Sequence, residues 1–230
     1  MHKIRNYFGL TLLAGAALLV SDLSIPASAQ RLDSIPAGQT ILTFVNRLLI
    51  NPPQVLVYGY FVDLAGIPGP LFSGAPGENT AYFTWSLNAQ GAVQLQNGDT
   101  KDPGAINVAV LPAAETFNVY FNATPNQNWS NPASFSAGQL IATFKSAPGT
   151  QTGAGPVAFV TQSYSLVSGH QFTFKGETYN LARLIPHGFT NFSVSGNIPL
   201  GGAIAPPLTF AAAGSAVAIG GPLSSLANRF

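Results

Sequence analysis

Cysteine is absent from the chain of 230 residues. The protein therefore cannot use thiol catalysis or disulfide exchange, and it has no cysteine ligands for zinc or an iron–sulfur cluster. Exported proteins are free to form disulfides, and this chain forms none. No cofactor is expected.

Charge is also scarce, because only 7% of the residues are Asp, Glu, Lys or Arg, against about 25% in typical soluble domains. The polar surface must then consist of Asn, Gln, Ser, Thr and backbone groups. Such a surface lacks the repulsion that keeps proteins apart, which is typical of a secreted coat, matrix or surface protein and equally of an acidic or salty habitat. Clustered positive charge is missing, so nucleic acid is not an expected partner.

The common catalytic motifs are missing as well. The chain has no GxSxG elbow, no SxxK pair, no HExxH helix and no phosphate-binding glycine loop before a helix. The remaining candidates for chemistry are Asp63 and Glu115, which lie in or beside predicted strands, and His170 and His187. These would have to meet in one cleft to act as an acid pair or to bind a metal. We favour the alternative that they are structural or surface residues.

One turn has the side chains of a weak calcium site. Asn97, Asp99 and Asp102 present three oxygen-bearing side chains close together, but the full calcium-loop pattern and its distal Glu are missing. Asn and Asp also hydrogen-bond the backbone in ordinary turns, and we favour that interpretation. No metal is therefore expected.

The first 29 residues have the three parts of a secretory signal peptide. Basic residues come first, an uncharged apolar stretch runs from Phe8 to Val20, and Ala27-Ser28-Ala29 precedes Gln30. No Cys follows the apolar stretch, so a lipoprotein signal is excluded. We expect a bacterial protein that is secreted, periplasmic or bound at the cell surface and begins near Gln30. A retained membrane anchor is the alternative.

Residues 30–197 predict an all-β domain. Segments rich in β-branched and aromatic residues alternate with Gly, Pro and Asn clusters, and long helical patterns are missing. Many short strands with frequent turns predict an antiparallel β-sandwich or a closed β-barrel. The predicted strands are 39–46, 54–64, 80–88, 91–96, 105–111, 115–123, 137–146, 156–167, 170–175, 177–184 and 189–196.

Several of these strands alternate with period two, which is typical of half-buried strands. Shared faces are expected for Phe117, Val119 and Phe121, for Leu140, Ala142 and Phe144, and for Phe172 and Phe174. The residues Lys175-Gly176-Glu177 predict a hairpin turn. Residues 147–156 are predicted to be the longest loop.

Residues 198–230 differ in composition from the β domain. They are rich in Ala, Gly and Pro, and no charge occurs before Arg229. We favour a last strand followed by a flexible tail. The alternatives are a cap over one end of the fold, or contact of the tail with a membrane or a second subunit.

Four aromatic residues are candidates for ligand contact. Tyr58, Tyr60 and Tyr82 lie on neighbouring predicted strands, and Trp129 lies in a polar loop. Such side chains can stack on sugars, although aromatic residues in strands more often stabilise the sheet by cross-strand pairing.

The favoured function is that of an exported, non-enzymatic β protein that binds or assembles at the cell surface or in the extracellular matrix. Its partner would be a saccharide, a surface component or a second copy of the chain. One alternative is a barrel that binds a small apolar ligand among Phe and Tyr side chains. The other is a hydrolase or isomerase that acts on saccharide or lipid.

Overall fold

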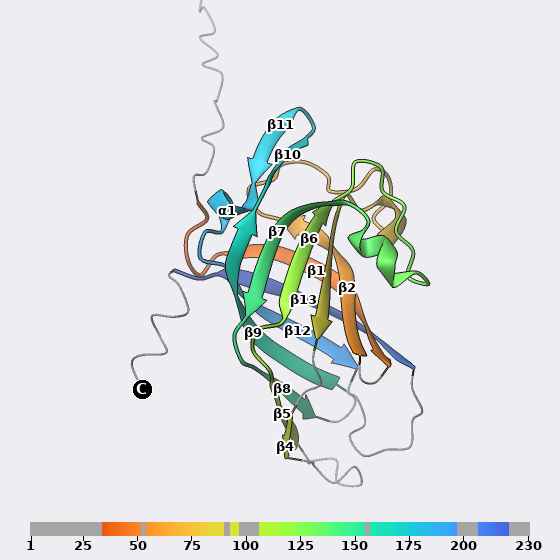
Figure 1. Ribbon diagram of the computed structural model, residues 1–230, viewed down its shortest axis with the longest axis vertical. Coiled ribbons are helices and arrows are strands. Elements are labelled where there is room, and N and C mark those ends of the chain that lie inside the picture. Colours follow the sequence, from red (N-terminus) through yellow and green to blue (C-terminus); the bar gives the residue numbers. More distant parts are fainter. Residues whose placement is uncertain are drawn as a thin grey trace, which may run out of the picture. The chain divides into compact units, whose positions relative to one another are not determined.

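Eight antiparallel strands close into a barrel (Figure 1). Each strand pairs with both neighbours, and the pairing of the last strand in the ring with the first closes it. The sequence predicted either a β-sandwich or a closed β-barrel, and the fold is the closed barrel. In order around the ring the strands are β12 (Phe189–Gly196), β13 (Leu208–Ala218), β1 (Thr40–Asn51), β2 (Gln54–Leu64), β3 (Phe83–Ala89), β6 (Thr116–Phe121), β7 (Gln139–Ser146) and β9 (Val157–Gly169).

The structure is a computed structural model, and it describes residues 34–51, 54–89, 93–96, 106–154, 157–196 and 207–220. The predicted signal peptide and the candidate calcium turn of Asn97, Asp99 and Asp102 lie outside these ranges. No helix within the ranges has the length and apolar character needed to cross a membrane.

Aromatic side chains fill the upper half of the barrel, which is the half nearest residues 171–180. The ring of Phe117 lies at the centre of this packing. Its centroid is 4.8 Å from that of Trp85, 5.4 Å from that of Tyr164 and 5.5 Å from that of Phe189. These residues come from four different strands, so their burial joins opposite walls of the barrel.

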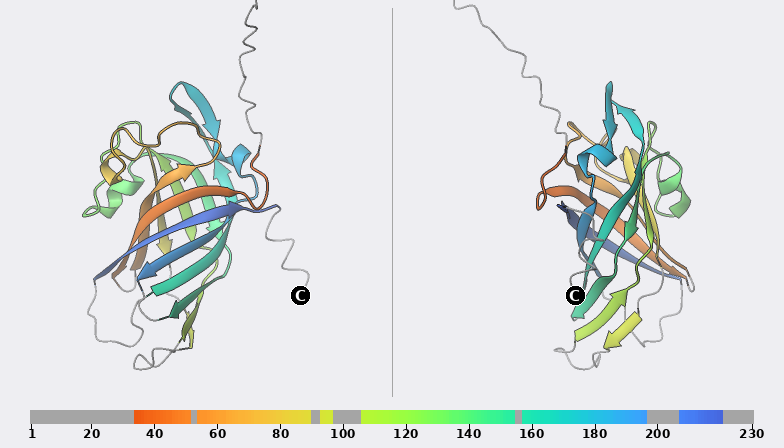
Figure 2. Two further views of the ribbon diagram at one scale, coloured as in Figure 1. Left: turned by 180° about the vertical axis from the view of Figure 1, so that it is seen from behind. Right: turned by 60° about the vertical axis from the view of Figure 1, so that its left-hand side comes forward.

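A hairpin closes the upper end of the barrel (Figure 2). It consists of β10 (Gln171–Phe174) and β11 (Glu177–Asn180). The hairpin turn lies where it was predicted, and its two turn residues are Lys175 and Gly176, since Glu177 already pairs with Phe174. Both turn residues have positive φ, 51° and 84°, as a two-residue hairpin turn requires. Phe172 and Phe174 share the buried face of β10, as predicted, and both rings contact Phe83.

A smaller run of strands continues the sheet below the barrel. β8 (Gly149–Ala154) pairs with the first half of β9, and β5 (Ile106–Leu111) and β4 (Val93–Gln96) follow it outward. The prediction that residues 147–156 form a loop was therefore wrong. Gly149, Gly153 and Ala154 have low strand propensity, and the ladders with β9 and β5 determine the structure of β8.

Three further differences from the sequence prediction have local causes. Ile141 is an extra residue in β7, and this bulge turns Leu140 outward, where it is 38% exposed. After β11 the chain forms α1 (Leu181–Leu184), because Asn180 accepts a hydrogen bond from the N–H of Ala182 as an N-cap. β1 continues to Asn51, five residues beyond the predicted end of that strand at residue 46.

The Ala- and Gly-rich residues 208–218 form a barrel strand. β13 lies between β12 and β1, so this part of the tail forms the last strand that was predicted. Gly214 faces Phe44, and a Cβ at this position would lie 2.8 Å from the Phe44 ring. The small residues of β13 thus make room for the large side chains on β1. The rest of the tail, residues 198–206 and 221–230, lies outside the described ranges.

Candidate functional site

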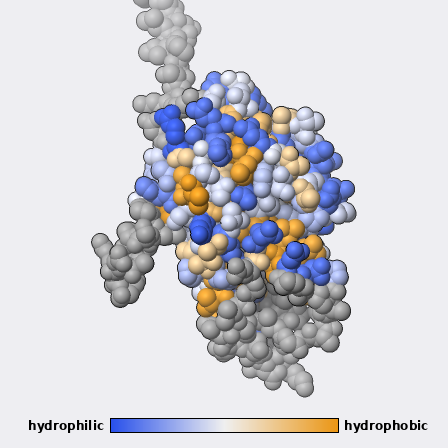
Figure 3. Space-filling view, in the orientation of Figure 1, coloured by the Kyte–Doolittle hydropathy of each residue, from blue (hydrophilic) through white to orange (hydrophobic). Residues whose placement is uncertain are grey.

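A groove of about 500 Å³ lies on the outer surface of the barrel. Its floor is the outer face of β3 and β6, and its wall is the 3-10 helix η2 (Pro132–Ser136). Blue and pale residues predominate on this side of the molecule in the space-filling view (Figure 3). The groove is lined by Leu56, Ser86, Asn88, Ala114, Glu115, Thr116, Asn118, Tyr120, Pro132, Ala133 and Ser136.

The floor of the groove is an array of neutral polar side chains. Ser86 lies directly opposite Asn118, and Asn88 lies directly opposite Thr116. Side chains opposite one another on a sheet are about 5 Å apart. The Thr143 hydroxyl on β7 donates to Asn118 Oδ1 over 3.0 Å, so the Asn118 amide is held with its oxygen toward β7. The floor therefore offers several hydroxyl and amide groups, and the one charged residue of the lining, Glu115, is 5% exposed.

The wall of the groove is anchored by a buried aromatic ring. Phe135 of η2 is fully buried, and its ring stacks on Trp129 at 4.7 Å and contacts Tyr58 at 5.1 Å. Its carbonyl oxygen accepts a 2.7 Å hydrogen bond from the buried hydroxyl of Thr84 on β3. Packing together with a buried hydrogen bond fixes the wall relative to the floor.

A buried polar network continues this anchor toward the upper end. Asn122 Nδ2 donates to the hydroxyl of Thr84 over 3.1 Å. The Gln127 amide, oriented with its oxygen toward Asn122, accepts from that amide and donates to the carbonyl of Glu78 over 3.0 Å. Gln127 is 1% exposed. The segment that carries η2 is thus tied to the barrel by satisfied buried hydrogen bonds.

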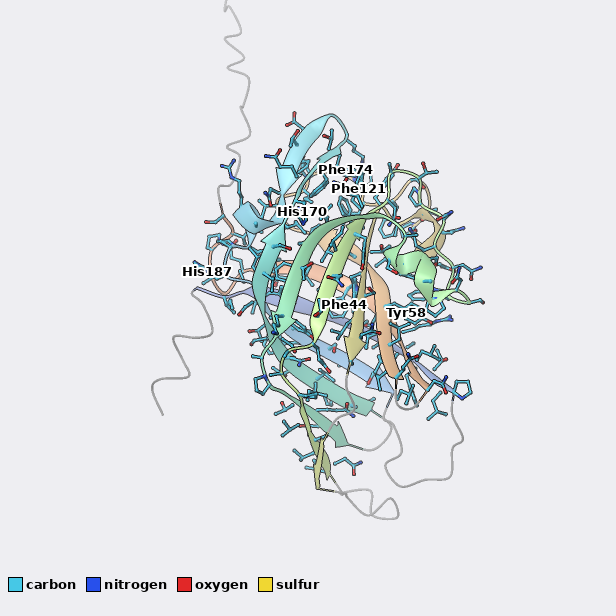
Figure 4. The ribbon with its side chains drawn as sticks, in the orientation of Figure 1. Phe44, Tyr58, Phe121, His170, Phe174 and His187 are labelled. Atoms are coloured by element: carbon cyan, nitrogen blue, oxygen red, sulfur yellow. The ribbon has the colours of Figure 1, made fainter. Side chains whose placement is uncertain are left out.

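Three of the four aromatic candidates meet beside this wall. Tyr58 and Tyr60 both contact Trp129 at 5.8 Å, and the Arg47 guanidinium lies 4.8 Å from the centre of the Trp129 ring. Figure 4 shows Tyr58 on the side of the barrel that carries η2. Burial raises the pKa of the Tyr58 hydroxyl, and the charge of Arg47 acts in the opposite direction. These rings pack on one another, so in this structure they hold the wall of the groove.

Tyr82 lies apart from the other three. It precedes β3 at the upper end of the barrel, where its ring meets Phe174 edge-on at 5.2 Å. Tyr82 is packed against the core beneath the hairpin.

The structure does not gather the candidate catalytic residues into one cleft. Asp63 is exposed near the upper end of β2, whereas Glu115 is buried near the lower end of the barrel. His170 and His187 are exposed, on separate segments before β10 and before β12 (Figure 4). Within the described ranges, no three His, Asp or Glu side chains stand close enough to hold a metal ion.

Glu115 takes part in a polar cluster where the barrel wall bends. Its N–H donates to the Ser146 hydroxyl over 3.0 Å. Tyr164 Oη donates to Gln162 Oε1 over 2.9 Å, and Gln162 Nε2 donates to the carbonyls of Pro112 and Ala147. Burial raises the pKa of the Tyr164 hydroxyl, and the negative charge of Glu115 raises it further. This cluster joins the two bends that separate β5 from β6 and β7 from β8.

The opposite side of the barrel has a different surface. Val194 of β12 lies directly opposite Phe159 of β9, and Phe192 is two residues away on the same outer face. These three side chains are 44%, 49% and 46% exposed. Because β12 is four strands from β3 in the ring of eight, the apolar surface and the polar groove face away from each other.

No protein family, curated protein or solved structure matches this chain. Its function must therefore be inferred from its own residues. The sequence alone does not distinguish Ser86, Asn88 and Asn118 from other polar strand residues. Their alternation with buried aromatic residues predicts that they point outward, but it does not predict that β3 pairs with β6.

Proposed function

We propose that this protein is an exported bacterial binding protein that holds a neutral saccharide in the groove between β3, β6 and η2. The observation that carries the proposal is the neutral polar array on the groove floor. Hydroxyl and amide side chains match the many donors and acceptors of a sugar, and the absence of positive charge from the lining gives an anionic polymer no favourable contact.

The walls of the groove complement this floor. Tyr120 is partly exposed in the groove and offers a ring face on which the C–H surface of a sugar can stack. Pro132 and Ala133 add a small apolar surface from η2. The anchored Phe135 keeps this wall in place before a ligand arrives, which reduces the entropy lost on binding.

The proposal of export rests on the first 29 residues. Their basic start, apolar stretch and small residues before Gln30 support cleavage by a signal peptidase. N-terminal sequencing of protein collected outside the cytoplasm should then begin at or near Gln30. Recovery of the chain only from the cytoplasm with its first residues intact would contradict export.

Affinity electrophoresis tests the groove. We expect laminarin, a neutral glucan, to retard the protein, and alginate, an anionic polysaccharide, to leave its mobility unchanged. Asn118→Ala and Tyr120→Ala should each weaken retardation by about tenfold, because each removes a hydrogen bond or a stacking surface.

The matched control is Thr161→Ala, on the outer face of β9 away from the groove. This variant should bind laminarin like the unmodified protein. Equal losses in all three variants would contradict the assignment of the groove. Trp129→Ala leaves the floor residues unchanged but removes the ring on which Phe135 of η2 stacks. This variant should lose less of the retardation by laminarin than Asn118→Ala.

A further inference from the structure

Three buried side-chain atoms have no hydrogen-bond partner among the described residues, and one of them is Asn191 Oδ1 on β12. The other two flank β2 on the inner wall of the barrel. They are Asn46 Oδ1 on β1 and Trp85 Nε1 on β3, and the residues are 5% and 4% exposed. One is an acceptor and the other a donor. Leaving such groups unpaired in an apolar interior is costly, so each requires an explanation.

The two atoms belong to neighbouring positions on the inner wall. Gly59 of β2 lies directly opposite Asn46 on one side and directly opposite Trp85 on the other. Asn46 shares the inward face of β1 with Phe44, whose ring meets Trp85 edge-on at 5.4 Å. Because Gly59 has no side chain, no third side chain projects from the wall between the donor and the acceptor.

Below this level some inward-facing side chains are only partly buried. Alternation from the buried residues Phe44 and Leu87 places Leu48 and Val57 on the inner face, where Leu48 pairs with Val57 and Val57 with Leu87. Leu48 and Val57 are nevertheless partly exposed, and so is Ser193 on the inner face of β12. A close-packed interior would bury such side chains. Below Asn46 and Trp85 the inner wall therefore has an apolar surface that solvent reaches.

We propose that the lower half of the barrel binds a small apolar molecule that carries one hydroxyl group. The hydroxyl would donate to Asn46 Oδ1 and accept from Trp85 Nε1, and the apolar body would lie against Leu48 and Val57. A hydroxyl supplies both hydrogen bonds at once, which a carboxylate cannot do.

The charge of the interior favours a neutral ligand over an anion. Among the inward-facing residues of the barrel strands that the structure describes, none is Lys or Arg. An aliphatic alcohol should therefore bind where the fatty acid of equal chain length does not. This site is separate from the groove and does not depend on saccharide binding.

Fluorescence of Trp85 gives a direct test. The chain has two Trp residues, so Trp129→Phe leaves Trp85 as the only one while keeping an aromatic ring on Phe135. We expect 1-octanol to shift the Trp85 emission and raise the Tm of this variant, and octanoate to do neither. Adding Asn46→Leu should weaken 1-octanol binding by about tenfold.

Two further variants make the result decisive. Val57→Phe should obstruct the place of the apolar body and abolish 1-octanol binding even if Asn46→Leu perturbs folding. Asn118→Ala changes only the outer groove and should bind 1-octanol normally. Equal binding of 1-octanol and octanoate, or unchanged affinity in Asn46→Leu, would overturn the proposal. Failure of both probes to change Trp85 emission would also overturn it, and would leave water as the partner of these atoms.

Discussion

The upper and lower halves of the barrel are built from the same strands but are filled differently. In the upper half, inward-facing aromatic residues such as Phe83, Phe117 and Phe144 are at most 6% exposed. In the lower half, inward-facing Leu48 and Val57 keep contact with solvent. The comparison teaches that ring closure alone does not produce a full core. Large rings and the β10–β11 hairpin cover one end, whereas at the other end inward-facing side chains remain in contact with solvent.

The largest expected effect is the difference in unfolding free energy lost when a side chain is truncated in the upper or in the lower half. Phe117→Ala should lower the free energy of unfolding by about 3–5 kcal/mol, because it removes a ring that contacts four others. Leu48→Ala should cost only about 1–2 kcal/mol, since that side chain is already partly exposed. Urea denaturation measures both. Equal losses would show that the lower half is packed as tightly as the upper.

Gly59 tests the boundary between the halves. A Cβ at this position would overlap the carbonyl oxygen of Val45 and lie 2.8 Å from Cα of Asn46. Gly59→Ala should therefore destabilise the barrel by about 1–3 kcal/mol. Gly74→Ala is the control, because its Cβ would make an ordinary 3.6 Å contact with Thr80. Similar melting temperatures for the two variants would argue against close approach of β1 and β2.

Two buried asparagines, Asn122 and Asn46, differ in their hydrogen bonding and should differ in their contribution to stability. Asn122 Nδ2 is bonded to Thr84, whereas Asn46 Oδ1 has no described partner. Asn122→Leu should destabilise the protein by about 1–3 kcal/mol, because it leaves Thr84 and Gln127 short of a partner. Asn46→Leu should leave stability unchanged or raise it. Chemical denaturation without ligand measures both, and a large loss in Asn46→Leu would reveal a missed partner.

The smallest effect concerns Tyr164, whose ring packs in the upper half while its hydroxyl bonds Gln162. Its pKa is raised in the folded state above the ordinary value of 10.0. The unfolded chain therefore loses this proton first as pH rises. Stability should be constant below pH of about 10 and fall above it by about 1.4 kcal/mol per pH unit for this group.

The variant Tyr164→Phe isolates this contribution. It should be less stable at neutral pH, because the hydrogen bond to Gln162 is lost, yet its stability should fall less steeply above pH 10. Denaturation curves between pH 8 and pH 12 make the comparison. Parallel curves for the two proteins would show that the Tyr164 hydroxyl already titrates normally in the folded state.

Most strands follow from the sequence alone. Alternation of Phe117 and Val119 with polar residues, and the Lys175-Gly176 turn, depend on local backbone geometry, so they predicted the faces and the hairpin correctly. β8 and the bulge at Ile141 did not follow, because pairing partners far along the chain determine both.

From its residues alone the protein is all-β, without thiols and with little charge, and its strands alternate in polarity. Which outward residues share a floor, and which inward residues share a wall, depends on the folded barrel. Ser86 meets Asn118, and Asn46 lies beside Trp85 across Gly59, through the order of strands in the ring. Alternation has the same period in every strand, so it carries no information about which strands become neighbours.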